Sequence, residues 1–218
     1  MTQDNLGVLV ALGGLYKAWD LGAETLSKSL GVPLCVEGCG LCCKNVPISY
    51  GVEAAYAMSL LLGEGRLKEM LSRAEGWLLD RHKEAPTYEP VRLGKVTREQ
   101  YPRLRQEHED LGRTFCPFLD ETKRCLVYGC RPLPCRAFSV TRAAPPVCQR
   151  PLGKGEKPER KAYLGADAAR ELKKVLDVLL KSVPKPTWAM AGFFPSMLYA
   201  LGEPGKYQTM VANNSVAT

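Results

Sequence analysis

The feature that most constrains this chain is the placement of its nine cysteines. Four of them lie between residues 35 and 43, and the other five lie between residues 116 and 148. Cysteines that only fill a core are scattered singly, so two dense groups indicate a shared chemical task. A disulfide framework is the competing interpretation, but an odd number of cysteines disfavours complete internal pairing. We therefore predict that the cysteines bind a metal centre.

The N-terminal region bears on where the chain is located. Its most apolar run, Leu6 to Leu15, is about half the length of a transmembrane helix. No basic residue precedes this run, and Asp4 lies beside it, so it is a poor signal peptide. We therefore expect a cytoplasmic protein with no membrane partner. Thiols stay reduced in that compartment, which favours metal or redox chemistry over disulfides.

The composition predicts a folded domain. The chain has 218 residues, of which 45% are hydrophobic and 24% are charged, as in ordinary globular proteins. We predict a mainly α protein: a single domain, 1–218, of several helices with long cysteine-rich loops and one small β-hairpin. The metal-binding region is expected at about 33–148, and the C-terminal helices at about 163–202. Apolar spacing predicts the helices at 4–30, 52–62, 66–83, 99–111, 163–182 and 195–202.

Local signals predict how these elements begin, turn and end. Ser49 is expected to cap the second helix, with Glu53 in its first turn. Residues 115–119 and 125–128 flank a charged turn and are expected to form the hairpin. The tail after Tyr207 is expected to fray.

Three motifs occur in order along the chain: C-x3-C-x2-C-C from Cys35, C-P-F-L from Cys116, and C-x-V-Y-x2-R-P-x2-C-R from Cys125. In this combination the chain resembles the YkgJ-type cysteine-cluster family, whose members are described as zinc- or iron-chelating domains. The resemblance covers residues 35 to 140 and leaves Cys130 and Cys148 outside the pattern. It implies that the metal ligands are Cys35, Cys39, Cys42, Cys43, Cys116, Cys125 and Cys135.

The choice of metal follows from the ligand types. Thiolates are soft ligands that suit zinc, iron–sulfur clusters or cuprous copper. Zinc sites often include histidine, yet His82 and His108 stand at no ligand spacing from a cysteine. An all-cysteine set favours an iron–sulfur cluster of the [4Fe-4S] type, with zinc as the alternative.

Three functions stay open at this point, and the chain need not be an enzyme. The first is an iron–sulfur protein for redox chemistry, electron transfer or sensing, with a redox or protein partner. The second is a structural zinc module contacting protein or nucleic acid; the formal net charge of +7 is diffuse and gives nucleic acid little support. A flagellin lysine methylase carries a similar cysteine set, so the third is S-adenosylmethionine-dependent methyl transfer.

Two arginines of the third motif are candidates for binding the cofactor. Arg131 and Arg136 flank the proline and cysteine of that motif. Their side chains would donate hydrogen bonds to cluster sulfurs or bind an anionic substrate. An ordinary salt bridge is the alternative for both residues, and the sequence leaves the choice open.

Overall fold

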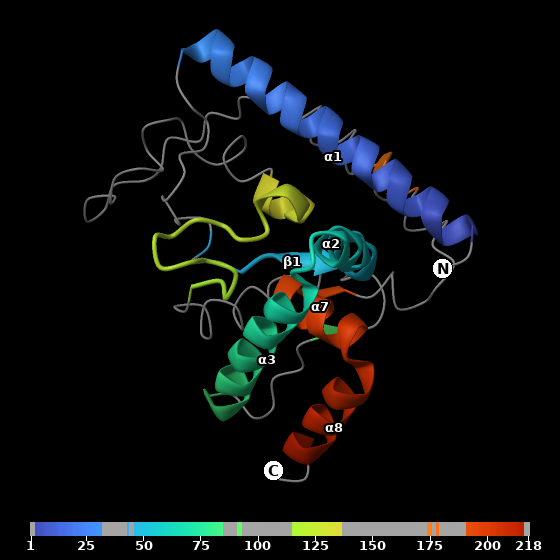
Figure 1. Cartoon of the computed structure of the whole chain (residues 1–218), viewed down its shortest axis with the longest axis vertical. Helices are drawn as coiled ribbons and strands as arrows, with labels where there is room; N and C mark the ends of the chain where they lie inside the picture. Colours follow the sequence, from blue (N-terminus) through green and yellow to red (C-terminus); the bar gives the residue numbers. More distant parts are fainter. Residues whose placement is uncertain are drawn as a thin grey trace.

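The structure, a computed structural model, describes residues 3–31, 43, 46–84, 91–92, 115–136, 174–175, 178 and 191–215. Within these ranges the chain is mainly helical with a small antiparallel sheet, which confirms the predicted fold class (Figure 1). The elements are α1 (Gln3–Leu30), β1 (Ile48–Tyr50), α2 (Gly51–Gly63), α3 (Leu67–Glu84), β2 (Val91–Arg92), η2 (Tyr128–Cys130), β3 (Ala191–Phe193), α7 (Phe194–Gly202) and α8 (Pro204–Ser215).

Four helices predicted from apolar spacing are confirmed within a few residues, namely α1, α2, α3 and α7. After α1, Gly31 takes a φ of 66°, a left-handed conformation that glycine adopts without strain at the end of a helix. The helix predicted at 99–111 lies outside the described residues. So does most of the helix predicted at 163–182, of which 174–175 and 178 are helical.

The structure corrects the prediction for the tail. Residues after Tyr207 do not fray within the described part of the chain, because α8 continues to Ser215. Tyr207 and Met210 pack against the main hydrophobic core. Packing onto the core therefore stabilises a helix whose own sequence gives a weak signal.

Ser49 is also placed differently from its prediction. It lies in β1, buried and paired with Gly192, because the backbone there joins a sheet. Tyr50 takes the N-cap position of α2 instead. Glu53 does lie in the first turn, as predicted, and its carboxylate accepts a hydrogen bond from the backbone N–H of Tyr50 at 2.9 Å.

The sheet is built from three short strands in the order β1-β3-β2, all antiparallel to their neighbours. Gly192 in the central strand pairs with Ser49 on one side and with Val91 on the other. The predicted hairpin is smaller than expected: 115–119 and 125–128 turn back on each other but pair through a single bridge. The sheet therefore comes from distant segments, and the segment 115–136, here named the cysteine loop, stays outside it.

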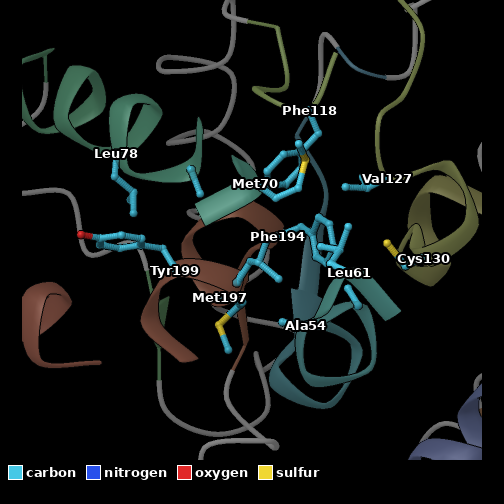
Figure 2. Packing of buried hydrophobic residues seen from close by; sticks show 13 residues of the cluster. Ala54, Leu61, Met70, Leu78, Phe118, Val127, Cys130, Phe194, Met197 and Tyr199 are labelled. Carbon is cyan, nitrogen blue, oxygen red and sulfur yellow. The ribbon is translucent and has the colours of Figure 1, made fainter. Parts of the chain in front are cut away.

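α7 is the centre of the main core and packs against α2, α3 and both β1 and β3. Figure 2 shows Phe194 and Met197 of α7 among side chains from α2, α3 and the cysteine loop. Phe118 of that loop meets Phe194 edge to face, with ring centroids 5.7 Å apart. An aromatic pair of this kind adds about 0.5–1.5 kcal/mol beyond the area it buries. The cysteine loop is therefore anchored in the core.

α1 packs along the other side of α2, through a second buried cluster that includes Leu12, Tyr16 and Val52. Its segment Leu6–Ser29, 24 residues, is long and apolar enough to cross a membrane by length and composition. The expectation from the sequence rested on the shorter run from Leu6 to Leu15, and the expected absence of a membrane partner stays a prediction. A buried core helix and a signal sequence pass the same test, but only 22% of this window is buried. Its buried side chains include Leu12 and Tyr16, which pack against α2.

Two adjacent glycines test how closely α1 approaches α2. A Cβ added at Gly14 would meet no atom of the described residues within 4 Å, whereas one at Gly13 would lie 3.0 Å from the ring of Tyr56. Alanine in a helix interior is favoured over glycine by about 0.5–1 kcal/mol. We expect Gly14→Ala to raise the free energy of unfolding by that amount, and Gly13→Ala to gain less or to lose stability. Urea unfolding measures both, and equal gains would contradict the close approach.

Candidate metal centre

The two cysteine groups meet at one backbone hydrogen bond. The N–H of Cys116 donates to the carbonyl oxygen of Cys43 at 2.8 Å. Cys116 also packs against Val46 and Phe193, in a small cluster beside the sheet. Segments far apart in the sequence are therefore in direct contact at the start of the second cysteine group.

Cys125 returns to the neighbourhood of Cys116 through a tight turn. Leu119 donates its N–H to the carbonyl of Cys116 at 3.2 Å, and Leu119 forms the single β-bridge with Cys125. The carboxylate of Asp120 stabilises the turn between them by accepting hydrogen bonds from the backbone N–H of Arg124 and of Thr122, both at 2.8 Å. The hydrogen bond from Arg124 contributes most to lowering the pKa of Asp120, and hydrogen bonds from Thr122 lower it further. The turn is thus held by local polar contacts.

Cys130 has a different environment from the other described cysteines. Its side chain is buried, and Figure 2 shows its sulfur pointing from η2 toward the core cluster near Val127. Burial, reinforced by repulsion from Cys125, raises the pKa of Cys130 to about 12. A thiol that stays neutral at physiological pH behaves as a small hydrophobe. The sequence left the role of Cys130 open, and these contacts are those of a core residue.

Cys135 lies on a helical turn at 133–136 that is tied to α2. Leu133 donates its N–H to the carboxylate oxygen Oε1 of Glu53 at 2.7 Å, and Tyr16 of α1 donates its hydroxyl to the same oxygen at 2.6 Å. Burial raises the pKa of Glu53, and the hydrogen bond from Tyr16 is the largest of the effects that lower it. The pKa of Tyr16 is raised well above its usual value, first by burial and then by Glu53. Cys135 is thus carried by a loop bonded to a buried carboxylate.

Arg136, a predicted cofactor-binding residue, is enclosed by the protein itself. Its guanidinium forms a salt bridge with Asp20 of α1 and donates to the carbonyls of Gly129 at 2.6 Å and Arg131 at 2.8 Å. It also lies over the ring of Tyr16, 4.3 Å from the centroid. These contacts match the salt-bridge alternative that the sequence left open.

Arg131, the second predicted cofactor-binding residue, packs on its own loop. Its guanidinium carbon lies 3.5 Å from the ring centroid of Tyr128, and its Nε donates to the Tyr128 carbonyl at 3.0 Å. Arg131 is only partly buried, while Tyr128 is 51% exposed. The stacked pair therefore lies on the surface of the cysteine loop. A role for Arg131 toward a cofactor stays a prediction.

Of the seven predicted ligands, the structure places Cys43, Cys116, Cys125 and Cys135, all partly buried thiols rather than half-cystines. Within the described ranges, no three or more His, Cys, Asp or Glu side chains are grouped closely enough to hold a metal ion. Those ranges leave out most of the first cysteine group. The ligand set therefore stays a prediction. The cysteines outside the described residues are Cys35, Cys39, Cys42 and Cys148.

Sequence reasoning missed the polar network that holds the cysteine loop to α1. Tyr16, Trp19 and Asp20 all contact it, since Trp19 Nε1 donates to the carbonyl of Arg136 at 3.1 Å. Trp19 itself lies on the buried face of α1. The available signal was the polar tip of Tyr16 and the carboxylate of Asp20 at the edge of that face, since buried polar groups need partners.

Comparison with known proteins adds no relative to this description. No family model matches the sequence, and neither a curated protein nor a solved structure matches it.

Proposed function

We propose that this chain binds a [4Fe-4S]-type iron–sulfur cluster through its cysteines and serves redox chemistry, electron transfer or sensing. The observation that carries the proposal is the hydrogen bond from Cys116 to Cys43, which brings the two cysteine groups together. A cluster of this type is held by four thiolates, and here the backbones of one cysteine from each group are hydrogen-bonded to each other. The motif resemblance to YkgJ-type domains supports the same proposal.

The environment of the described thiols suits such a cluster. Cys116 and Cys125 pack against the main hydrophobic core and are only partly exposed. A hydrophobic shell limits solvent access to a cluster and influences its reduction potential. The turn between these cysteines and the anchored ring of Phe118 would hold the sulfurs in place. A bound cluster would supply one-electron transfer, and the protein would supply ligands, shielding and a docking surface for a redox partner.

Zinc is the second candidate, and one observation favours it. Four-thiolate zinc sites often take their cysteines from short turns, and Cys116 begins a turn of that kind at 116–119. A zinc site would be structural and would direct the function toward binding protein or nucleic acid. The donor atoms are the same in both cases, so the metal itself must be identified.

Anaerobic purification of the full chain, with visible absorption and elemental analysis, tests the proposal. We expect a brown protein that contains iron and acid-labile sulfide in nearly equal amounts, since a [4Fe-4S] cluster has four of each. A colourless protein with stoichiometric zinc would replace the cluster by the structural alternative. A protein purified from iron-supplemented medium with neither metal would contradict both.

A further inference from the structure

We infer that Glu53 is the positioning residue that holds the Cys135 loop ready for metal ligation, an inference that rests on the proposed function. Glu53 lies on α2, and it is joined to the loop by the hydrogen bond from the Leu133 N–H to Oε1, at 2.7 Å. Leu133 precedes Cys135 by two residues, on the same helical turn. The position of the thiol therefore depends on a carboxylate distant in the sequence.

The carboxylate of Glu53 accepts from three donors of three different segments. Oε1 receives the Leu133 N–H and the Tyr16 hydroxyl, while Oε2 receives the Tyr50 N–H. Only 1% of Glu53 is exposed. A donor that lost its bond to this carboxylate would therefore stay unsatisfied, which costs free energy of folding. One side chain thus joins α1, the end of β1 and the cysteine loop.

Glutamine is the substitution that tests this arrangement with the least change of shape. Its amide has one accepting oxygen and a donating NH₂ group. In Glu53→Gln the amide either turns its NH₂ group toward Leu133 and loses the bond to the loop, or keeps that bond on a neutral oxygen and loses the bond from Tyr50. A neutral acceptor forms a weaker hydrogen bond than a carboxylate, so the attachment of the loop weakens in either case. We expect the segment 133–136 to be held less firmly against α2 while the helices stay folded.

The chain offers a control in a second contact between a tyrosine and a carboxylate, which is partly buried. Tyr199 of α7 donates its hydroxyl to Oε1 of Glu75 of α3 at 2.5 Å. Among the described residues, neither of these two hydrogen-bonds to the segment 131–136. Glu75→Gln keeps an oxygen that accepts from Tyr199, so it should leave the cysteine loop unchanged.

The first readout needs no metal. The metal-free full chain is treated with iodoacetamide, and alkylation is followed at each cysteine by peptide mass spectrometry. In Glu53→Gln, Cys135 should react several-fold faster than in the wild type, while the buried Cys130 stays protected. Glu75→Gln should match the wild type at both thiols. An unchanged rate at Cys135 overturns the inference, and so does a parallel rise at Cys130, which would report general unfolding.

The second readout is the release of bound metal to a chelator. Loss of a residue that orients a ligand costs roughly 10- to 100-fold in metal affinity, so we expect release from Glu53→Gln to be at least roughly tenfold faster. Metal-loaded Glu53→Gln that releases metal at the wild-type rate overturns the inference and leaves the proposed function standing. A wild-type chain without metal overturns the proposed function instead.

A second variant keeps the inference testable should Glu53→Gln fail to fold. Tyr16→Phe removes one donor to Glu53, and Tyr199→Phe removes the donor to Glu75, with the same chemical change in each. Cys135 should be alkylated faster in Tyr16→Phe than in Tyr199→Phe. Equal rates at Cys135 in the two variants would overturn the inference.

Discussion

Cys135→Ala is expected to lose most of the bound metal, whereas Cys130→Ala keeps it, although the two cysteines lie in one short loop. Cys135 is a partly buried thiol and a fixed cysteine of the third motif, C-x-V-Y-x2-R-P-x2-C-R, whereas Cys130 points into the core. A four-iron cluster loses a bond to iron when one of its thiolates is removed. Iron and sulfide per chain, measured after anaerobic purification, should fall sharply in the first variant alone.

The same pair of variants separates metal loss from instability. Removal of the buried Cys130 sulfur should lower the free energy of unfolding by about 1 kcal/mol, as for one buried methylene-sized group. Urea unfolding of the metal-free chains measures this cost, and metal-free Cys135→Ala should lose less. Loss of metal in Cys130→Ala would contradict the assignment of that residue to the core. Full metal content in Cys135→Ala would remove it from the ligand set.

Arg136→Ala is expected to be among the most destabilising substitutions in the chain. The side chain of Arg136 is 1% exposed, and its removal leaves the carbonyls of Gly129 and Arg131 without their donor. It also removes the salt bridge that joins the loop to Asp20 of α1. Breaking a buried ion pair by removing one partner costs about 3–5 kcal/mol. We expect a loss of about 3 kcal/mol, because Asp20 is half exposed and can be rehydrated.

Arg73→Ala is the control for this effect. Arg73 also makes an ion pair, with Glu69 at 3.1 Å, and donates to the carbonyls of Pro117 and Leu119 at 3.4 Å. Its side chain is 39% exposed, and exposed pairs of this kind contribute only about 0–1 kcal/mol. Urea unfolding followed by circular dichroism compares the two variants. An equal loss of unfolding free energy in the two variants would mean that burial does not determine how much Arg136 stabilises the fold.

Helices with a clear apolar face could be predicted from the sequence, because side-chain spacing alone determines which face is buried. The spacing in the segment from Leu9 to Trp19 is of this kind, and both residues are buried. The sheet could not be predicted in this way. Its strands have two or three residues each, which is too short to show an alternation of apolar and polar residues. Ser49 has the side chain of a good helix cap, and its strand partner is known only from the fold.

The site shows the same division between local and distant information. Spacing and motif order predicted that the two cysteine groups act together; the backbone contact of Cys116 with Cys43 brings one residue of each group together, and a shared metal centre stays a prediction. No local pattern connects Glu53 with Leu133, since the contact depends on how α2 and the loop pack. Cys130 was ambiguous for the same reason: its burial comes from the core cluster around it and not from its own motif.

The central position of β3 and α7 has a consequence for the order of events during synthesis. Both elements come after all the described cysteines, yet β3 lies between β1 and β2, and α7 is the centre of the core. A ribosome adds about 5–20 residues per second, so Cys135 is made some seconds before Phe194. During that interval the thiols have no completed core behind them. The nascent chain therefore exposes its thiols to metal donors and to oxidants before its own fold can shield them.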